Sequence, residues 1–371
     1  MKKMTPLRAI LSFVLLLAFA AVSSAQGLVD SRRALSTFPD SQAVLFINVK
    51  RFVGEALPRV LPPAEYQKML AEPQKVGFDV RGVEYAIAGV RFADPPSASG
   101  LPEFVVLLKG NFNADSLLAL AKLGMSTQNL QSRQESYGSK TLEIVNVEKL
   151  MADEPKQGEE RKPAPYPEIA AAALDANTLV LGVPAYVRAT IDAAGGGQGQ
   201  LRPALVNLAT HDPQALWSLS AELPPSLPEY IKKLGLPPNA EIDNMIGWFK
   251  QVSFSNGMDA LNFTLRAAVG ADSAEHASAL SGIVNMGIKA AQSAAEGDIA
   301  RKKAKPRESE QARMALSALR TFTNRTEGNT LLLGISVPQK TVSELVRKEF
   351  VKKPVPPRAR MGTRRRGVRR K

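Results

Sequence analysis

The sequence predicts an α+β fold in two similar halves, each mainly an antiparallel sheet with helices packed on one face. Three observations predict it. Apolar strand patterns recur along the chain, each followed by a few turn residues and a helical pattern. Short matches recur in the same order in both halves of the chain. The composition, 44% hydrophobic and 22% charged, is typical of a folded globular protein.

Six strand–turn–helix units are expected along the chain. Their strands are at 43–49, 104–110, 178–183, 215–223, 261–270 and 330–337. Asn113 or Asp115 can cap the helix that follows the second strand, and Pro184 suits the first turn of the helix after the third. Tyr186 and Tyr230 fall in amphipathic helical patterns and are expected to pack against a sheet. Further strands are expected at 82–92, 141–147, 168–174 and 249–255.

Three collinear matches predict that one α+β unit is duplicated. The clearest is NTLVLG at 177–182 against NTLLLG at 329–334, each followed closely by proline and a helical pattern. The other two pair 42–44 with 214–216, and Ala-Asp-Ser at 114–116 with Ala-Asp-Ser at 271–273. Because the order is preserved, we weight the set above any single match.

These patterns divide the chain into five parts. The expected parts are a signal peptide (1–25), a first α+β half (26–194), a Gly-rich linker (195–200), a second α+β half (201–351) and a disordered basic tail (352–371). The polar, proline-rich stretch 151–167 interrupts the first half as an exposed loop. The segment 300–325 interrupts the second half. It holds a basic cluster from Arg301 to Arg307 between two helical stretches, and Pro306 is expected to break or start a helix there.

The net charge of +13 lies entirely at the two ends of the chain. Lys2, Lys3 and Arg8 supply three positive charges, and residues 352–371 supply ten, so residues 26–351 are neutral overall. A neutral body has no basic face for nucleic acid, which makes that partner unfavoured.

The first 25 residues have the pattern of a secretory signal. Two lysines precede the apolar stretch from Ala9 to Val22, and Ser23-Ser24-Ala25 offers small residues for cleavage. An uncleaved membrane anchor is the alternative, although the stretch is shorter than the ~20 apolar residues of a bilayer span. The chain has no cysteine, which excludes disulfides, thiol catalysis, thiolate metal sites and lipid attachment through cysteine. We therefore expect a periplasmic or extracellular protein, with membrane association left open.

The sequence carries no recognisable catalytic or cofactor motif. His211 and His276 lie in different segments without the H-x-x-x-H spacing of a metal site, and there is no G-x-S-x-G, S-x-x-K, G-x-G-x-x-G or P-loop pattern. The acidic pairs Asp153-Glu154 and Glu159-Glu160 lie in a charged, solvated loop. We expect no catalytic residue, cofactor or metal. An enzyme with a site assembled from scattered Asp, Glu, Lys and Tyr residues stays open.

The tail is the only candidate binding segment that the sequence singles out. Its prolines, glycines and repelling charges predict disorder when free. Such a tail binds polyanions in a salt-dependent way, and the expected partner is an anionic envelope surface: lipid head groups, lipopolysaccharide phosphates or an acidic polymer. A tail that only aids solubility, or is removed by proteolysis, is the alternative. The candidate polyanion-binding residues are Arg358, Arg360, Arg364, Arg365, Arg366, Arg369, Arg370 and Lys371.

Three stretches carry a resemblance to a known family: PDSQAVLFINVKRF, LLKGNFNADSLLALA and ALDANTLVLGVPAYVRATIDA. Over roughly residues 37–350 the chain resembles an uncharacterised family of exported bacterial proteins with duplicated strand–turn–helix repeats. The resemblance implies export and an α+β repeat fold, and it transfers no catalytic residue. The leading interpretation is a non-catalytic envelope protein, a duplicated binding or scaffold module with a cationic tail and an unknown protein partner. The alternative is an envelope enzyme of hydrolase type.

Overall fold

The computed structural model describes residues 31–75, 77–92, 102–126, 130–147, 166–197, 200–223, 247–301 and 306–350. The expected signal peptide, nearly all of the polar loop, the helix expected after residue 223 and the basic tail lie outside the described residues.

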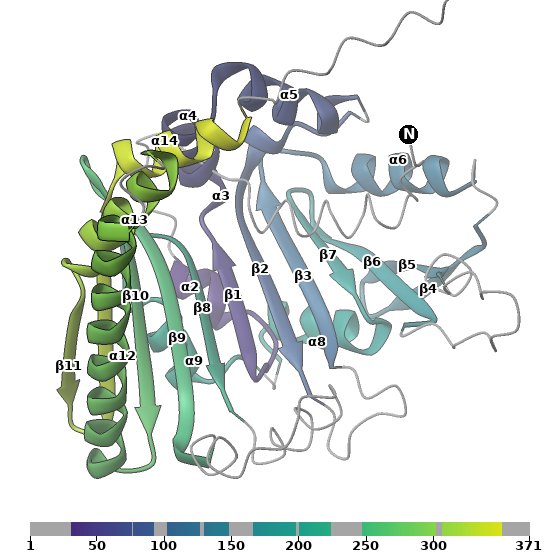
Figure 1. The fold of residues 1–371 in the computed structure, drawn as a ribbon. Helices are drawn as coiled ribbons and strands as arrows, with labels where there is room; N and C mark the ends of the chain where they lie inside the picture. Colours follow the sequence, from purple (N-terminus) through teal and green to yellow (C-terminus); the bar gives the residue numbers. More distant parts are fainter. Residues whose placement is uncertain are drawn as a thin grey trace, which may run out of the picture.

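The twelve strands of the described residues form one antiparallel sheet, which with its helices confirms the α+β class (Figure 1). The strand order is β11-β12-β10-β9-β8-β1-β2-β3-β7-β6-β5-β4, so the two predicted halves share a continuous sheet and meet at the β1–β8 pair. The strands are β1 (Ala43–Ile47), β2 (Val83–Arg91), β3 (Glu103–Gly110), β4 (Ser132–Tyr137), β5 (Lys140–Asn146), β6 (Glu168–Asp175), β7 (Thr178–Gly182), β8 (Ala215–Glu222), β9 (Phe249–Met258), β10 (Asn262–Ala271), β11 (Thr323–Glu327) and β12 (Thr330–Pro338).

The helices begin where the sequence offers caps and prolines. Asn113 Oδ1 accepts the Ser116 amide at 2.7 Å, Pro184 stands at the first turn of its helix, and Pro306 begins another. The helices are α2 (Ser31–Ser36), α3 (Val49–Arg51), a π-helical turn (Phe52–Ala56), α4 (Leu57–Val60), α5 (Pro63–Gln74), a 3₁₀ turn (Val80–Gly82), α6 (Ala114–Ser126), α8 (Pro184–Ala194), α9 (Pro203–Ala209), α12 (Ala274–Arg301), α13 (Pro306–Leu319) and α14 (Gln339–Phe350).

The two edge strands, β4 and β11, are the ones that the apolar patterns did not predict. Their sequences, SRQESY and TNRTE, are polar throughout. Each joins its neighbour through a hairpin with a glycine at positive φ, Gly138 at 56° and Gly328 at 58°. Polar, charged edges oppose pairing with further chains, so these strands close the sheet without apolar alternation.

The two faces of the sheet differ in how helices cover them. We call the face that carries α2, α8 and α9 the covered face; there Phe46, Ile87 and Val105 are at most 4% exposed. We call the opposite face the open face. Its helices stand at the margins: α12 over β10 and β12, α6 near β5 and β6, and α3, the π-helical turn and α5 across one end of β1 and β2 (Figure 1).

Within the described residues we find no helix whose length and apolar content would allow it to span a bilayer.

Candidate functional site

The most unusual surface of the described structure is the middle of the open face. Directly opposed residues form a cross-strand row that is apolar over eight strands, and we call it the apolar row. Its members, from β12 to β7, are Leu333, Ala267, Phe254, Leu219, Leu45, Ala88, Val106 and Leu181. Leu219 is 37% exposed and Phe254 is 42% exposed although both belong to interior strands. Leu265, beside the row on β10, is 46% exposed.

This exposure is opposite to what a half-solvated antiparallel sheet normally shows. Such a sheet alternates apolar residues toward the core with polar residues toward water. Here Phe46 faces the core and its neighbour Leu45, on the open face, is apolar as well. Continuous apolar runs are typical of strands buried on both faces, yet helices bury only one face of these strands completely. Exposed apolar side chains that gather on one face are typical of interaction sites.

Marginal helices cover part of the apolar row, where Leu333 and Leu45 pack against their clusters, and they leave Leu219 and Phe254 exposed. At one end α12 packs Ala277 and Leu280 against Leu331, and Asn324 Nδ2 donates to the Ser281 carbonyl at 3.0 Å. At the other end α6 reaches the sheet through Lys122 Nζ, 3.3 Å from a Glu143 carboxylate oxygen. These contacts hold the helices at the margins, and no helix of the described residues covers Leu219 or Phe254.

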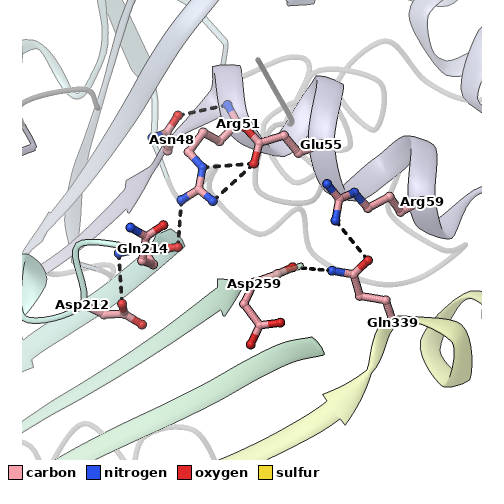
Figure 2. Close-up of polar contacts among 8 residues, drawn as sticks. All are labelled: Asn48, Arg51, Glu55, Arg59, Asp212, Gln214, Asp259 and Gln339. Atoms are coloured by element: carbon pink, nitrogen blue, oxygen red, sulfur yellow. Dashed lines mark hydrogen bonds and ion pairs between the residues drawn. The ribbon is translucent and has the colours of Figure 1, made fainter. Parts of the chain in front are cut away.

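A polar network joins the π-helical turn to the loop before β8. Asn48 Oδ1 accepts the Arg51 amide at 3.0 Å, and Glu55 Oε2 lies 3.3 Å from both Arg51 Nε and Nη2 (Figure 2). Arg51 Nη1 donates to the Gln214 carbonyl at 2.9 Å, and the Gln214 amide donates to Asp212 Oδ1 at 3.1 Å. Arg51 is the N-cap residue of the π-helical turn, and it links that turn to the second half. Turns of this kind often occur at functional positions.

A second polar contact ties the same helical segment to α14. Arg59 Nη1 donates to Gln339 Oε1 at 3.2 Å, and Gln339 Nε2 donates to the Asp259 carbonyl at 2.6 Å (Figure 2). Asp259 Oδ1 in turn accepts the amides of Leu261 and Asn262, which lowers the pKa of the Asp259 carboxyl. The two halves are therefore joined by side chains as well as by the β1–β8 pair.

The two histidines lie in separate places. His211 borders a hollow on the covered face, next to Asp212. His276 stacks on Trp248, with ring centres 4.3 Å apart, and its Nδ1 lies 2.5 Å from Asp272 Oδ1. This hydrogen bond lowers the pKa of the Asp272 carboxyl. In the part of the chain that the structure describes, no three His, Cys, Asp or Glu side chains are grouped as a metal site would require.

Sequence reasoning named the tail as the binding segment, and its residues Arg358 to Lys371 lie outside the described residues. It did not find the open face. The signal was present, because AVLFI, FVVLL and TLVLG are apolar on both sides of the strand. Only the placement of the helices shows that one of those sides is left uncovered.

Comparison with known proteins gives little. No family model matches the sequence, and no curated protein matches it. Solved structures of TP0453 in its crystal forms III, IV and I are similar in fold, with TM-scores of 0.41, 0.41 and 0.40 and identities of 10%, 10% and 11%. Each alignment covers 85% of this chain, and 97%, 98% and 96% of the respective neighbour. Likeness at this level carries no argument about function.

Proposed function

We propose that the chain is a non-catalytic, exported binding module. Its open face docks an apolar helical surface of a protein partner, and its basic tail holds it at an anionic envelope surface. The observation that carries the proposal is the exposure of Leu219, Phe254 and Leu265 in the middle of the sheet. Fully burying an exposed Leu or Phe side chain contributes ~1.5–3 kcal/mol. These residues are 37–46% exposed, so a partner that covers them gains roughly 1 kcal/mol from each.

The shape of the open face favours a protein over a small molecule. Small-molecule sites are concave and enclosed, and one hollow of that kind lies on the covered face. The apolar row between β9 and β3 crosses four strand spacings of ~4.8 Å, or roughly 19 Å. Helices pack about 8–10 Å apart. The uncovered area therefore accommodates two helices side by side, the layer that a sheet of this kind lacks on that face.

The order of elements in the two halves supports the proposed duplication. Outward from the centre, β1-β2-β3-β7-β6 is matched by β8-β9-β10-β12-β11. The paired Asn-Thr turns also make similar contacts, to carbonyls that lie two residues apart in the strand registers. Asn177 Nδ2 donates to the Phe112 carbonyl and Asn329 Nδ2 to the Ala271 carbonyl, each at 2.9 Å. A duplicated, catalytically silent unit suits a scaffold, and it agrees with the exported family that the sequence resembles.

Export and tethering are supported by the sequence. An apolar, lysine-preceded N-terminal stretch favours export, and ten cations in residues 352–371 favour an anionic surface. Each basic residue near such a surface contributes ~1 kcal/mol and is screened by salt.

One experiment tests both parts. Cells express the full-length chain with a photo-crosslinking amino acid in place of Leu219 or Phe254, and a control carries it at Leu261. Leu261 is 74% exposed but lies in the turn before β10, away from the apolar row. We expect one discrete protein adduct from the two face positions and none from the control. Lipid adducts, adducts of two copies of this chain, or equal adducts at Leu261 would overturn the docking proposal.

The same cells are then fractionated with and without a high-salt wash. We expect the full-length chain in the envelope fraction and its release by salt, whereas a chain stopped after Val351 stays soluble. If both forms fractionate alike, the tail is not the tether. Because the adduct is scored separately, failure of the tether leaves the docking result standing.

A further inference from the structure

The hollow on the covered face lies beyond the end of α9, over the outer strands of the second half. It has a volume of about 270 Å³. Its lining mixes apolar residues such as Leu208 and Leu332 with a polar group. The polar group and the glycine beside it are Ser253, Ser255, Arg266, Thr323, Arg325 and Gly334. We call it the groove.

A buried carboxylate holds one of the two guanidinium groups in place. The Asp212 side chain is only 2% exposed, and its Oδ2 lies 2.7 Å from Arg266 Nη1. Ser255 Oγ lies 3.4 Å from the same oxygen, and the Gln214 amide occupies Oδ1. Asp212 is anchored through Gln214 to Arg51, and it in turn positions the Arg266 side chain over the groove. About half of the surface of the Arg266 side chain stays exposed to solvent.

The groove occupies a place that a helix fills in the other half. The NTLVLG and NTLLLG stretches place Gly182 of β7 opposite Val105, and Gly334 of β12 opposite Arg266. In the first half α8 packs on β3, β6 and β7 at this place. In the second half α14 packs instead on α4 at the end of the sheet. Among the described residues no helix takes the place of α8 over the corresponding strands β10, β11 and β12, and the groove lies there.

The residues at matched positions have changed from apolar to polar. In the first half they are core residues with at most 4% exposure, apart from Gly89, and in the second half they carry hydroxyls and guanidinium groups. The matched positions follow from the strand registers, read outward from the β1–β8 pair. Ser218 and Ser220 match Val44 and Phe46, and Ser253 and Ser255 match Ile87 and Gly89. Arg266 matches Val105, and Thr323 and Arg325 match Ala170 and Ala172.

We propose that the groove binds a small ligand through an oxyanion group, a carboxylate or a phosphate, held between Arg266 and Arg325. The two arginines lie two strands and one two-residue step apart, roughly 12 Å between Cα atoms, so their long side chains can converge on one anion. Gly334 lies between them on β12 and has no side chain of its own there, and the small Thr323 side chain lies beside it. Guanidinium forks bind carboxylate and phosphate in two-pronged geometry.

Buried hydroxyls beside the groove are better explained by a site for a polar ligand than by a strand that is simply exposed to solvent. Ser253 is 8% exposed, and the Ser220 hydroxyl opposite it is fully buried without a hydrogen-bond partner in the described structure. A surface strand that merely lost its helix has no need of a buried carboxylate or a buried hydroxyl, each of which costs free energy to desolvate. This site lies on the face opposite the docking surface and does not depend on it.

The test is calorimetric titration of the full-length protein with inorganic phosphate and with succinate, at constant ionic strength. Arg325→Ala removes a groove cation whose acidic partner, Glu327, is exposed. Arg320→Ala is the matched control, because Arg320 is equally exposed and pairs with Glu296 outside the groove. We expect saturable binding of one probe, a Kd raised about tenfold or more by Arg325→Ala, and a Kd within about twofold of the parent for Arg320→Ala.

A second variant, Arg266→Lys, keeps the charge that Asp212 needs but loses the fork. We expect it to weaken binding with an unchanged thermal midpoint, which separates ligand contact from folding. Preference for phosphate or for succinate identifies the oxyanion. No saturable binding of either probe would overturn the proposal. Equal weakening by Arg325→Ala and Arg320→Ala would also overturn it, because anion binding would then not depend on the groove.

Discussion

At the scale of single residues, Tyr186 is the polar anchor of the covered face. Its side chain is fully buried, its hydroxyl donates to the Asp40 carbonyl at 2.9 Å, and Ser41 Oγ lies 2.5 Å from it. Arg91 Cζ lies 4.6 Å from the ring centre. Burial raises the pKa of the Tyr186 hydroxyl to about 12, although the Ser41 hydrogen bond opposes that shift.

We predict that Tyr186→Phe destabilises the protein by about 1–2 kcal/mol near pH 8, because two buried hydrogen bonds are lost. The pKa is raised above its unfolded value, so the folded state favours the neutral phenol. Its contribution to the free energy of unfolding is complete below about pH 10 and is lost as the pH rises toward 12. The stability gap between the two proteins should therefore narrow between pH 10 and 12 in urea unfolding. A gap that stays constant over that range would contradict this.

The sequence could predict Tyr186 but not Asp212. Tyr186 repeats with Val187 and Thr190 on one helix face, so the 3.6-residue period shows that it packs on the sheet, and the structure confirms it. Asp212 reads as an ordinary turn residue in THDP. Its burial arises because α9 ends above β9 and β10, which bring Ser255 and Arg266 to it from more than forty residues away.

At the scale of elements, the two Asn-Thr hairpins offer a matched test. A Cβ at Gly182 would lie 2.4 Å from the Phe104 carbonyl oxygen and 2.7 Å from Val105 Cα, both backbone atoms. A Cβ at Gly334 would meet Thr323 Oγ1 at 2.6 Å, and that side chain can rotate away.

We predict that Gly182→Ala destabilises the protein by more than about 2 kcal/mol, because β3 and β7 must separate locally. Gly334→Ala should cost less than about 1 kcal/mol. Guanidinium unfolding of both variants measures the difference. Equal losses of stability would show that the two glycines are packed alike, and would contradict the difference in the atoms around each Cβ.

The apolar patterns predicted ten of the strands, and the other two were not predicted because their sequences are polar. The ten expected strands carry Val, Ile, Leu or Phe in runs that only a sheet buries efficiently. β4 and β11 are held by their hairpin turns and by ladders to β5 and β12, and neither signal depends on side-chain hydropathy. Helix α9 was missed for a related reason: its seven residues are too few to show a period.

At the scale of the whole molecule, the sequence predicted the class and could not predict the strand order. Two halves with similar patterns can form two sheets or one. The choice depends on the β1–β8 pairing, which joins Ala43–Ile47 to residues about 170 positions later. The same limit hid the open face, since apolar strands indicate burial on both sides without showing which layer is missing.

The measurement that tests the account most directly compares the unfolding free energies of Phe46→Ala and Phe254→Ala in the purified full-length protein. Phe46 is 4% exposed on the covered face, and Phe254 is 42% exposed in the apolar row. If the open face is kept for a partner, Phe46→Ala should cost about 3–5 kcal/mol and Phe254→Ala, with its side chain partly exposed, only about 1–2 kcal/mol. Comparable losses for the two variants would mean that Phe254 belongs to the protein's own core, and the docking surface would not exist.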